Sequence, residues 1–319
     1  INTIHTRTKN QYRQFFTTMK YPPFFLPGLL FSILLLTTSY IVLEKTVQED
    51  PPSFEEYWLK GNGEVNSYAL KQIRYGEIHE GEVILTFLAE DFSRSKQVRL
   101  DYPEKAGSDA VKVLKVNQIR KFTTGIYDYS ILQSVFTPID LKKYPNSMKI
   151  TTSIQDWSGH IYSQLNLRPY QFILQLRSYF ESEGDQEFQL EKALLEDEIW
   201  NLIRVDPKAL PEGSIQIIPS IITSHLRHYA LGLEEARAKL NIGKKTSTYE
   251  VNFLDSDRKL KISFQTEFPH VIEGWEEQYK EAGKRLTTTA TLKKSMQIEY
   301  WHRHFNSDRK LREELQLGK

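Results

Sequence analysis

The 319-residue sequence predicts a mainly β protein of the α+β kind, with one or more large antiparallel sheets or a half-barrel and one packing helix. Short runs rich in Val, Ile, Thr, Tyr and Phe, broken by Gly, Pro and Asp, recur between about residues 57 and 180. Only one clear segment has apolar residues at helical spacing. Many short strands with few helices favour antiparallel pairing.

Individual strands are predicted where apolar and polar residues alternate, or where a short apolar run lies between turn residues. Residues 111–116 (VKVLKV) alternate as a half-buried strand does, and Asp255–Asp257 is a turn between the two strands of a hairpin. The predicted strands are 81–88, 111–116, 148–154, 160–167, 170–180, 248–253, 260–264 and 286–298.

The helix is predicted from Phe188 to Leu202, because apolar residues recur at roughly helical spacing with charged residues on the other side. The segments Asp206-Pro207 and 211–213 (PEG) end it. Residues 231–240 are compatible with a helix or with a strand, and the charged tail from Asn306 is either helical or loose.

A signal or transmembrane helix is predicted to precede this body, at Tyr21–Leu43, where 23 residues carry no charged side chain. About 20 apolar residues in a helix span a hydrocarbon core of roughly 30 Å, so the stretch is long enough to cross a membrane. The first 43 residues contain four Lys or Arg and no acid, whereas Glu44, Glu49 and Asp50 follow at once. This asymmetry predicts an N-terminus inside and an exported remainder.

Two interpretations of Tyr21–Leu43 stay open. A signal peptide would begin near Met19, which would make residues 1–18 upstream sequence, and would be cut after Ser39. A permanent single-pass anchor would keep the helix. The prolines at 22, 23 and 27 fit a buried helix of a soluble domain badly.

The expected domain organisation follows from these segments. It comprises a basic N-terminal segment that lies upstream of the true start in one interpretation (1–20), the signal peptide or transmembrane helix (21–43), a linker (44–56), a β-rich periplasmic domain (57–305) and a charged tail (306–319). Two lobes, about 57–183 and 184–305, are an alternative division of the β-rich domain.

Composition excludes several classes of protein. Hydrophobic residues make up 39% and charged residues 26%, which fits neither a disordered chain nor a multi-span membrane protein. The 42 Lys and Arg nearly balance 41 Asp and Glu, so no basic surplus indicates a nucleic-acid partner. Without a cysteine there is no thiol nucleophile, thiolate zinc site or disulfide.

The first candidate site is a metal centre at His302, His304 and Asp308. Residues two apart on a strand face the same side, so the two imidazoles of an extended segment 300–304 would bind one metal ion, with Asp308 as third ligand. The alternative is a solvated strand end with aromatic packing from Trp301.

Three further groups of residues carry weaker signals. His225 and His228 would share a helix face at a spacing that metal sites use, if that segment is helical. Segments 77–80 (EIHE) and 156–160 (DWSGH) combine carboxylate and imidazole at turns, which suits proton transfer but is also ordinary turn composition. Phosphate-loop, nucleophile-elbow and zinc-protease motifs are absent from the sequence.

Several runs together resemble an exported Bacteroidetes family that carries the name septum formation inhibitor Maf. They are 57–61 (YWLKG), 74–81 (RYGEIHEG), 90–93 (EDFS), 96–98 (KQV), 180–185 (FESEGD), 274–277 (GWEE) and 311–315 (LREEL). The resemblance implies a location in the cell envelope. Maf pyrophosphatases carry a Ser-x-Ser-Pro-Arg-Arg run, whereas none of the 13 prolines here precedes an arginine. Members of the exported family look like lipoproteins, but Tyr40 stands where their cysteine would follow Ser39.

The sequence thus predicts a membrane-associated protein of the cell envelope, at the inner or outer membrane, with its body facing the periplasm. We expect a non-catalytic binding or assembly module for an apolar ligand such as a lipid, or for an envelope protein partner. The alternative is a metal- or carboxylate-dependent hydrolase, including a Maf-like nucleotide pyrophosphatase. That alternative predicts one pocket shared by at least three of Glu77, His79, Asp156, His160, His302, His304 and Asp308.

Overall fold

The computed structural model of the protein describes residues 52–318, and within them the mainly β class is confirmed. Fifteen strands form one open sheet in the order β8-β7-β6-β5-β4-β3-β2-β1-β15-β14-β13-β12-β11-β10-β9. Neighbouring strands are antiparallel except β9 and β10, which are parallel. The stretch predicted to be a signal or transmembrane helix lies outside the described residues. Within 52–318, the helices are all too short or too polar to span a bilayer.

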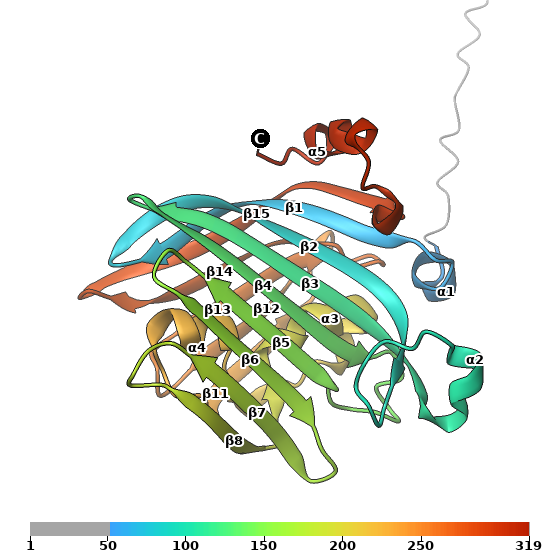
Figure 1. Ribbon diagram of the computed structural model, residues 1–319, viewed down its shortest axis with the longest axis horizontal. Coiled ribbons are helices and arrows are strands. Elements are labelled where there is room, and N and C mark those ends of the chain that lie inside the picture. Colours follow the sequence, from blue (N-terminus) through green and yellow to red (C-terminus); the bar gives the residue numbers. More distant parts are fainter. Residues whose placement is uncertain (1–51, 319) are drawn as a thin grey trace, which may run out of the picture. The chain divides into compact units, whose positions relative to one another are not determined.

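The strands account for most of the described chain (Figure 1). They are β1 (Gly63–Arg74), β2 (Glu77–Ser93), β3 (Ala110–Thr124), β4 (Tyr127–Pro138), β5 (Lys149–Gln155), β6 (His160–Leu167), β7 (Gln171–Ser178), β8 (Asp185–Glu191), β9 (Leu194–Leu195), β10 (Gly213–Ile218), β11 (Glu234–Asn241), β12 (Thr246–Phe253), β13 (Lys259–Gln265), β14 (Ile272–Glu281) and β15 (Lys284–Ile298). The helices are α1 (Phe54–Trp58), α2 (Pro103–Ala106), α3 (Ile199–Val205), α4 (Ile221–Arg227) and α5 (Lys310–Glu314).

The sheet has two wings that meet at the β1–β15 pair. The first wing is β1–β8 and the second is β9–β15, and each strand mostly pairs with the next one along the chain. The two outer edges, β8 and β9, are nonetheless separated by only Lys192 and Ala193. Since consecutive Cα atoms are about 3.8 Å apart, the two edges must lie close together. The sheet therefore folds back on itself, and the wings face each other.

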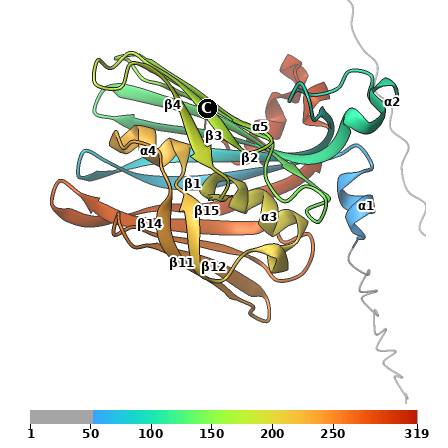
Figure 2. The ribbon, with the colours of Figure 1, turned by 90° about the horizontal axis from the view of Figure 1, so that it is seen from below.

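Helices α3 and α4 lie between the two wings (Figure 2). On α3, the Asn201 amide donates to the Leu114 carbonyl of β3 at 3.0 Å, while Trp200 meets Trp275 of β14 with ring centroids 5.9 Å apart. Each wing thus packs against the same helix. One hydrophobic core formed from both wings and both helices follows from this arrangement.

The predicted strands are confirmed, with observed bounds that extend several of them. In β12 exposed or half-buried residues alternate with buried ones, as expected for a strand with one face in the core. The ambiguous segment 231–240 is largely strand β11, and the tail is helical over residues 306–314. Helix α1 begins at Phe54, within the segment predicted to be a linker.

The helix predicted from Phe188 to Leu202 is wrong over most of its length. Residues 185–191 are edge strand β8, 194–195 are β9, and regular α-helix begins only at Ile199. The physical reason is in the spacing: Phe188 and Leu190 are two residues apart, which is the period of a strand. The single packing helix is also a correction, because α3 and α4 both pack between the wings.

Candidate functional site

The residues of the predicted metal centre lie near the C-terminal tail and are not on a strand. His302 ends a 3-10 turn (Tyr300–His302), and the Nδ1 atom of His304 contacts the Trp301 carbonyl at 3.1 Å. The Asp308 carboxylate accepts the backbone N–H of Phe305 at 3.0 Å. Within residues 52–318, no group of three or more His, Cys, Asp or Glu side chains is arranged to hold a metal ion.

The other predicted acid–base residues occupy separate hairpins. The Nε2 atom of His79 contacts the Arg74 carbonyl at 3.1 Å, and that of His160 contacts the Ser153 hydroxyl at 2.8 Å. The Asp156 carboxylate accepts the backbone N–H groups of the following turn, at 2.6 and 3.1 Å. None of the seven residues of the predicted hydrolase pocket lines the cavity around His225 or the cavity around Arg168. The structure therefore does not bring them together.

The structure instead brings Glu183, His225 and His228 together around one cavity of about 260 Å³. Glu183 lies in the turn between β7 and β8, His225 is on α4, and His228 follows α4 directly. The apolar walls of this histidine cavity are Leu174, Leu176, Phe188, Ala230 and Leu231. An apolar cavity with a few converging polar groups is the usual form of a small-molecule site.

The first polar feature of the cavity is a carboxylate–imidazole pair. His228 Nδ1 lies 2.7 Å from Glu183 Oε1, and the Ser178 hydroxyl donates to Glu183 Oε2 at 2.6 Å. Burial opposes ionisation of Glu183, but the hydrogen bonds from Ser178 and His228 lower the pKa of its carboxyl group. With Glu183 ionised, Nδ1 of His228 is the donor, so the carboxylate fixes the orientation of the imidazole.

His225 is the second polar feature, and it is an uncharged imidazole. Its side chain is 5% exposed, and its Nε2 atom lies 3.0 Å from the hydroxyl of Ser163, on β6. Burial lowers the pKa of His225 to about 4. At neutral pH His225 therefore offers the cavity a neutral hydrogen-bonding ring.

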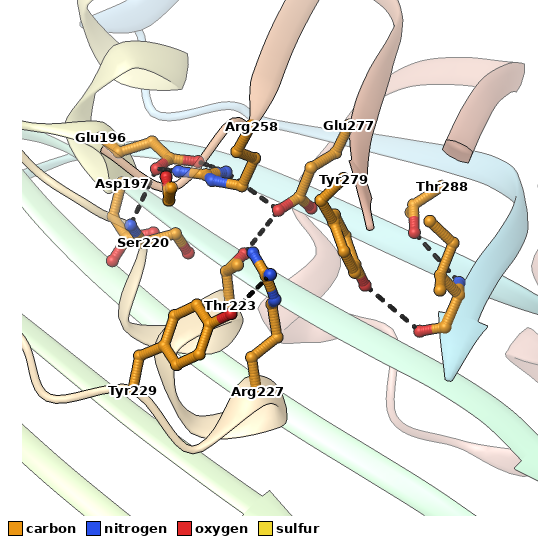
Figure 3. Close-up of polar contacts among 12 residues, drawn as sticks. Glu196, Asp197, Ser220, Thr223, Arg227, Tyr229, Arg258, Glu277, Tyr279 and Thr288 are labelled. Carbon is orange, nitrogen blue, oxygen red and sulfur yellow. Dashed lines mark hydrogen bonds and ion pairs between the residues drawn. The ribbon is translucent and has the colours of Figure 1, made fainter. Parts of the chain in front are cut away.

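A network of buried charges holds α4, which carries His225, in place (Figure 3). Arg258 donates to Glu196 and to Glu277, with an Arg258 Nη1–Glu277 Oε1 distance of 2.9 Å, and all three side chains are nearly inaccessible. Thr223 of α4 donates to the same Glu277 oxygen at 2.9 Å. The helix is thereby tied to β14 of the second wing.

Two neighbouring acids receive the first N–H groups of α4. Glu196 accepts the backbone N–H of Ser220 at 2.8 Å, and Asp197 accepts that of Ile221 at 3.0 Å. A helix leaves these N–H groups without intrahelical partners, so the two acids satisfy them inside the core. Burial and the nearby Glu196 charge raise the pKa of Asp197 to about 7.

Contacts at the other end of α4 connect this network to the histidine cavity. The guanidinium of Arg227 lies 4.3 Å from the Tyr279 ring and 4.4 Å from the Tyr229 ring, and it donates to the Tyr229 hydroxyl at 2.7 Å (Figure 3). Tyr229 lines the cavity. Arg74 of β1 donates to the Leu226 carbonyl. Both wings therefore fix the segment that carries the two histidines.

The spacing of His225 and His228 suits a shared metal ion only if both residues lie on one helix face. Helix α4 ends at Arg227, and His228 has left-handed backbone angles (φ 56°, ψ 43°), so its ring turns to Glu183 and the β7–β8 turn. In the sequence, Glu183 stands out only as part of the run 180–185 (FESEGD) of the family resemblance. It is 45 residues from His228, and nothing in the local pattern indicates that the two side chains meet.

Comparisons of the chain with protein-family models, with curated proteins and with solved structures find no match.

Proposed function

We propose that the protein is a membrane-associated binding module of the cell envelope. Its ligand is a small, mainly apolar molecule with one hydroxyl, carbonyl or N–H group, held in the histidine cavity. The observation that carries the proposal is the neutral, buried His225 beside the Glu183–His228 pair, within apolar walls. Such walls favour an apolar body, and the fixed imidazoles favour one hydrogen-bonding group.

The size of the cavity limits the ligand. At about 260 Å³ it lies just below the range of roughly 300 to 1,000 Å³ that drug-sized molecules occupy. A single short chain or up to three aromatic rings would fit. Because Glu183 already accepts from His228 and Ser178, its carboxylate is not free to pair with a charged group on the ligand.

The envelope address is supported by the charge-free stretch Tyr21–Leu43 and its flanking charges. Native mass spectrometry of the protein extracted gently from its own membrane would test it. Retention of that stretch supports an anchor, and its loss supports a cleaved signal. A bound molecule of small mass would also give the class of the ligand.

A hydrolase is the second candidate, because a carboxylate-oriented imidazole such as His228 is a common general base. It ranks lower since Ser163, the hydroxyl within reach of His225, is fully buried, and the carboxylate orients the other histidine. Hydrolysis of p-nitrophenyl acetate that is lost in His228→Gln but kept in His160→Gln would favour it.

Binding is tested with N-phenyl-1-naphthylamine, a neutral apolar fluorophore with one N–H group. We expect saturable, stoichiometric fluorescence enhancement with the wild-type protein. Ala230→Phe, which enlarges a surface residue at the cavity wall, should weaken binding at least about tenfold, since it removes volume that the ligand occupies.

The matched control is Leu254→Phe, which enlarges another exposed apolar residue away from the cavity. It should bind the fluorophore as the wild type does. If the wild type shows no saturable enhancement, or if Ala230→Phe and Leu254→Phe bind equally well, the ligand site is not this cavity.

A further inference from the structure

A second cavity, of about 540 Å³, opens among the loops at one end of the first wing. We call it the basic cavity, because Arg94, Arg168 and Lys192 line it together with Tyr144, Met148 and Leu167. These residues come from the β2–β3, β4–β5 and β6–β7 connections, from the last residue of β6 and from the two-residue link between β8 and β9. No residue lines both this cavity and the histidine cavity.

Arg168 and Lys192 of the basic cavity contact backbone carbonyls rather than carboxylates of the described chain. Lys192 Nζ donates to the Pro169 carbonyl at 2.7 Å, and Arg168 Nη1 contacts the Leu167 carbonyl at 3.3 Å. Within residues 52–318, Arg94, Arg168 and Lys192 form no ion pair. Backbone carbonyls orient such cations but leave their charge free for an anion.

Of the acids near these loops, Asp109 partly offsets Arg94, since hydrogen bonds from Ser93 and Ser95 and then the Arg94 charge lower the pKa of its carboxyl group. The Asp109 carboxylate accepts from the Ser93 hydroxyl at 2.5 Å and from the Ser95 N–H at 2.8 Å, and it does not line the cavity. Asp140 accepts the backbone N–H of Lys143 at 3.1 Å. The cavity therefore keeps an excess of positive charge.

The loops around the cavity are fixed in place by a buried side chain. Gln97 is 4% exposed, donates to the Leu167 carbonyl at 2.6 Å and accepts from Asn166. Lys149 donates to the Gln97 carbonyl at 3.2 Å, and burial together with the Arg168 charge lowers the pKa of its ammonium. The site is thus largely formed before a ligand arrives, which reduces the ordering that binding requires.

We propose that the basic cavity binds a phosphate-class oxyanion, and that its apolar wall of Met148, Leu167 and Pro169 contacts the carbon chain that carries this group. The site has three cations, and two of them are guanidinium groups. They suit a doubly charged phosphate better than a single carboxylate, because each guanidinium can donate two parallel hydrogen bonds to a pair of phosphate oxygens. The same chemistry occurs in an anionic lipid headgroup and in a soluble phosphomonoester.

The lipid source is favoured by the predicted membrane segment Tyr21–Leu43, which precedes α1 in the sequence. Phe54 of α1 and residues 139–142 of the β4–β5 connection line one common hollow, so α1 lies beside the loops that form the basic cavity. Ten residues separate Leu43 from Phe54, a reach of at most about 40 Å. If Tyr21–Leu43 is embedded in a membrane, as the sequence predicts, a linker of this length keeps the body within reach of lipid headgroups.

The test is isothermal titration calorimetry of the full chain in a neutral detergent, with hexyl phosphate and with inorganic phosphate. Hexyl phosphate should bind the wild type, and the charge-reversed variant Arg168→Glu/Lys192→Glu should weaken binding at least about 30-fold, because two charge-assisted contacts are lost. The control is Arg237→Glu/Lys239→Glu, which changes the net charge equally at exposed residues of β11. It should bind within about threefold of the wild type.

The two ligands distinguish the sources. At least tenfold tighter binding of hexyl phosphate supports a phosphate that carries an alkyl chain, as in a lipid, whereas equal or tighter binding of inorganic phosphate supports a small soluble one. Failure of both ligands to bind the wild type at millimolar concentration overturns the proposal, as does equal weakening in the two charge-reversed variants. Binding of N-phenyl-1-naphthylamine should be unchanged in both charge-reversed variants, which separates this site from the histidine cavity.

Discussion

Replacement of His225 by glutamine tests whether this imidazole is buried and neutral. Glutamine can place an amide near the position of the imidazole Nε2, so the contact with Ser163 can be kept while the titrating group is lost. The pKa of His225 falls from an ordinary 6.5 to about 4 in the folded protein. Because the folded-state pKa is lowered, the stability linked to His225 is present above pH 6.5 and is lost as the pH falls towards 4.

The size of this effect follows from the shift. A difference of about 2.5 pKa units at about 1.4 kcal/mol each corresponds to roughly 3 kcal/mol, all of it between pH 6.5 and 4. Urea unfolding, followed by tryptophan fluorescence at pH 7, 6, 5 and 4, measures it as a difference between wild type and His225→Gln. That difference should shift by about 3 kcal/mol in favour of the variant on acidification.

The control is His160→Gln. His160 makes the same kind of contact, with the Ser153 hydroxyl at 2.8 Å, but at an exposed position. Its difference from the wild type should change by less than about 0.5 kcal/mol across the same pH range. A constant difference for His225→Gln, or an equal change for both variants, would refute the inference that the histidine cavity contains a buried neutral imidazole.

Three further predictions concern the interior. Asp197 has a raised pKa of about 7, so the stability linked to its protonated carboxyl group is lost as the pH rises from 4 through 7. In urea unfolding, Asp197→Asn should therefore be more stable than the wild type at pH 8 by up to about 4 kcal/mol, with no gain at pH 4. Arg204→Met leaves the fully buried Glu64 unpaired and should cost about 3 to 5 kcal/mol, most of it recovered when Glu64→Gln is added in a double-mutant cycle. Gly274→Ala places a Cβ 2.3 Å from a carbonyl oxygen of β15 and should lower the free energy of unfolding by about 1 to 3 kcal/mol, measured as a lower thermal midpoint. Gly232→Ala, in open space, should leave the midpoint unchanged.

The strands could be predicted because their signal is local. In β3, Lys112 is exposed between two buried valines, and Lys115 is half-buried between buried neighbours, which is the polar–apolar pattern that predicted this strand. The helix at 188–202 failed for a related reason. A set of apolar residues that serves an edge strand, a short parallel strand and the start of α3 in turn gives an average spacing close to that of a helix.

The histidine cavity could not be predicted, because its parts meet only after the sheet folds back. Glu183 lies in a hairpin turn of the first wing, and His225 and His228 lie on the segment between β10 and β11. Composition marks Glu183 as an ordinary turn residue. The contact depends on the β8–β9 link, which brings the two edges of the sheet together, and no local pattern encodes that closure.

The buried charges between the wings explain why the closure has one geometry. Burial of an ion pair such as Glu64–Arg204 carries a desolvation cost that the Coulomb attraction only partly offsets, so apolar residues of similar volume would serve stability as well or better. Apolar contacts are not directional, whereas ion pairs with hydrogen bonds fix the orientation of both partners. Arg204 on α3 pairs with β1 of the first wing, while Arg258 and Glu277 of the second wing fix α4 through Glu196 and Thr223.

Each of these contacts is lost if a wing shifts by one residue, because the buried charge is then left without its partner. The network therefore specifies the register in which the wings and the two helices meet. That register sets the position of His228 relative to Glu183. Because the two residues come from distant parts of the chain, the shape of the histidine cavity depends on it. The polar interior thereby supports the proposed binding site, although no residue of the Arg258 network itself lines the histidine cavity.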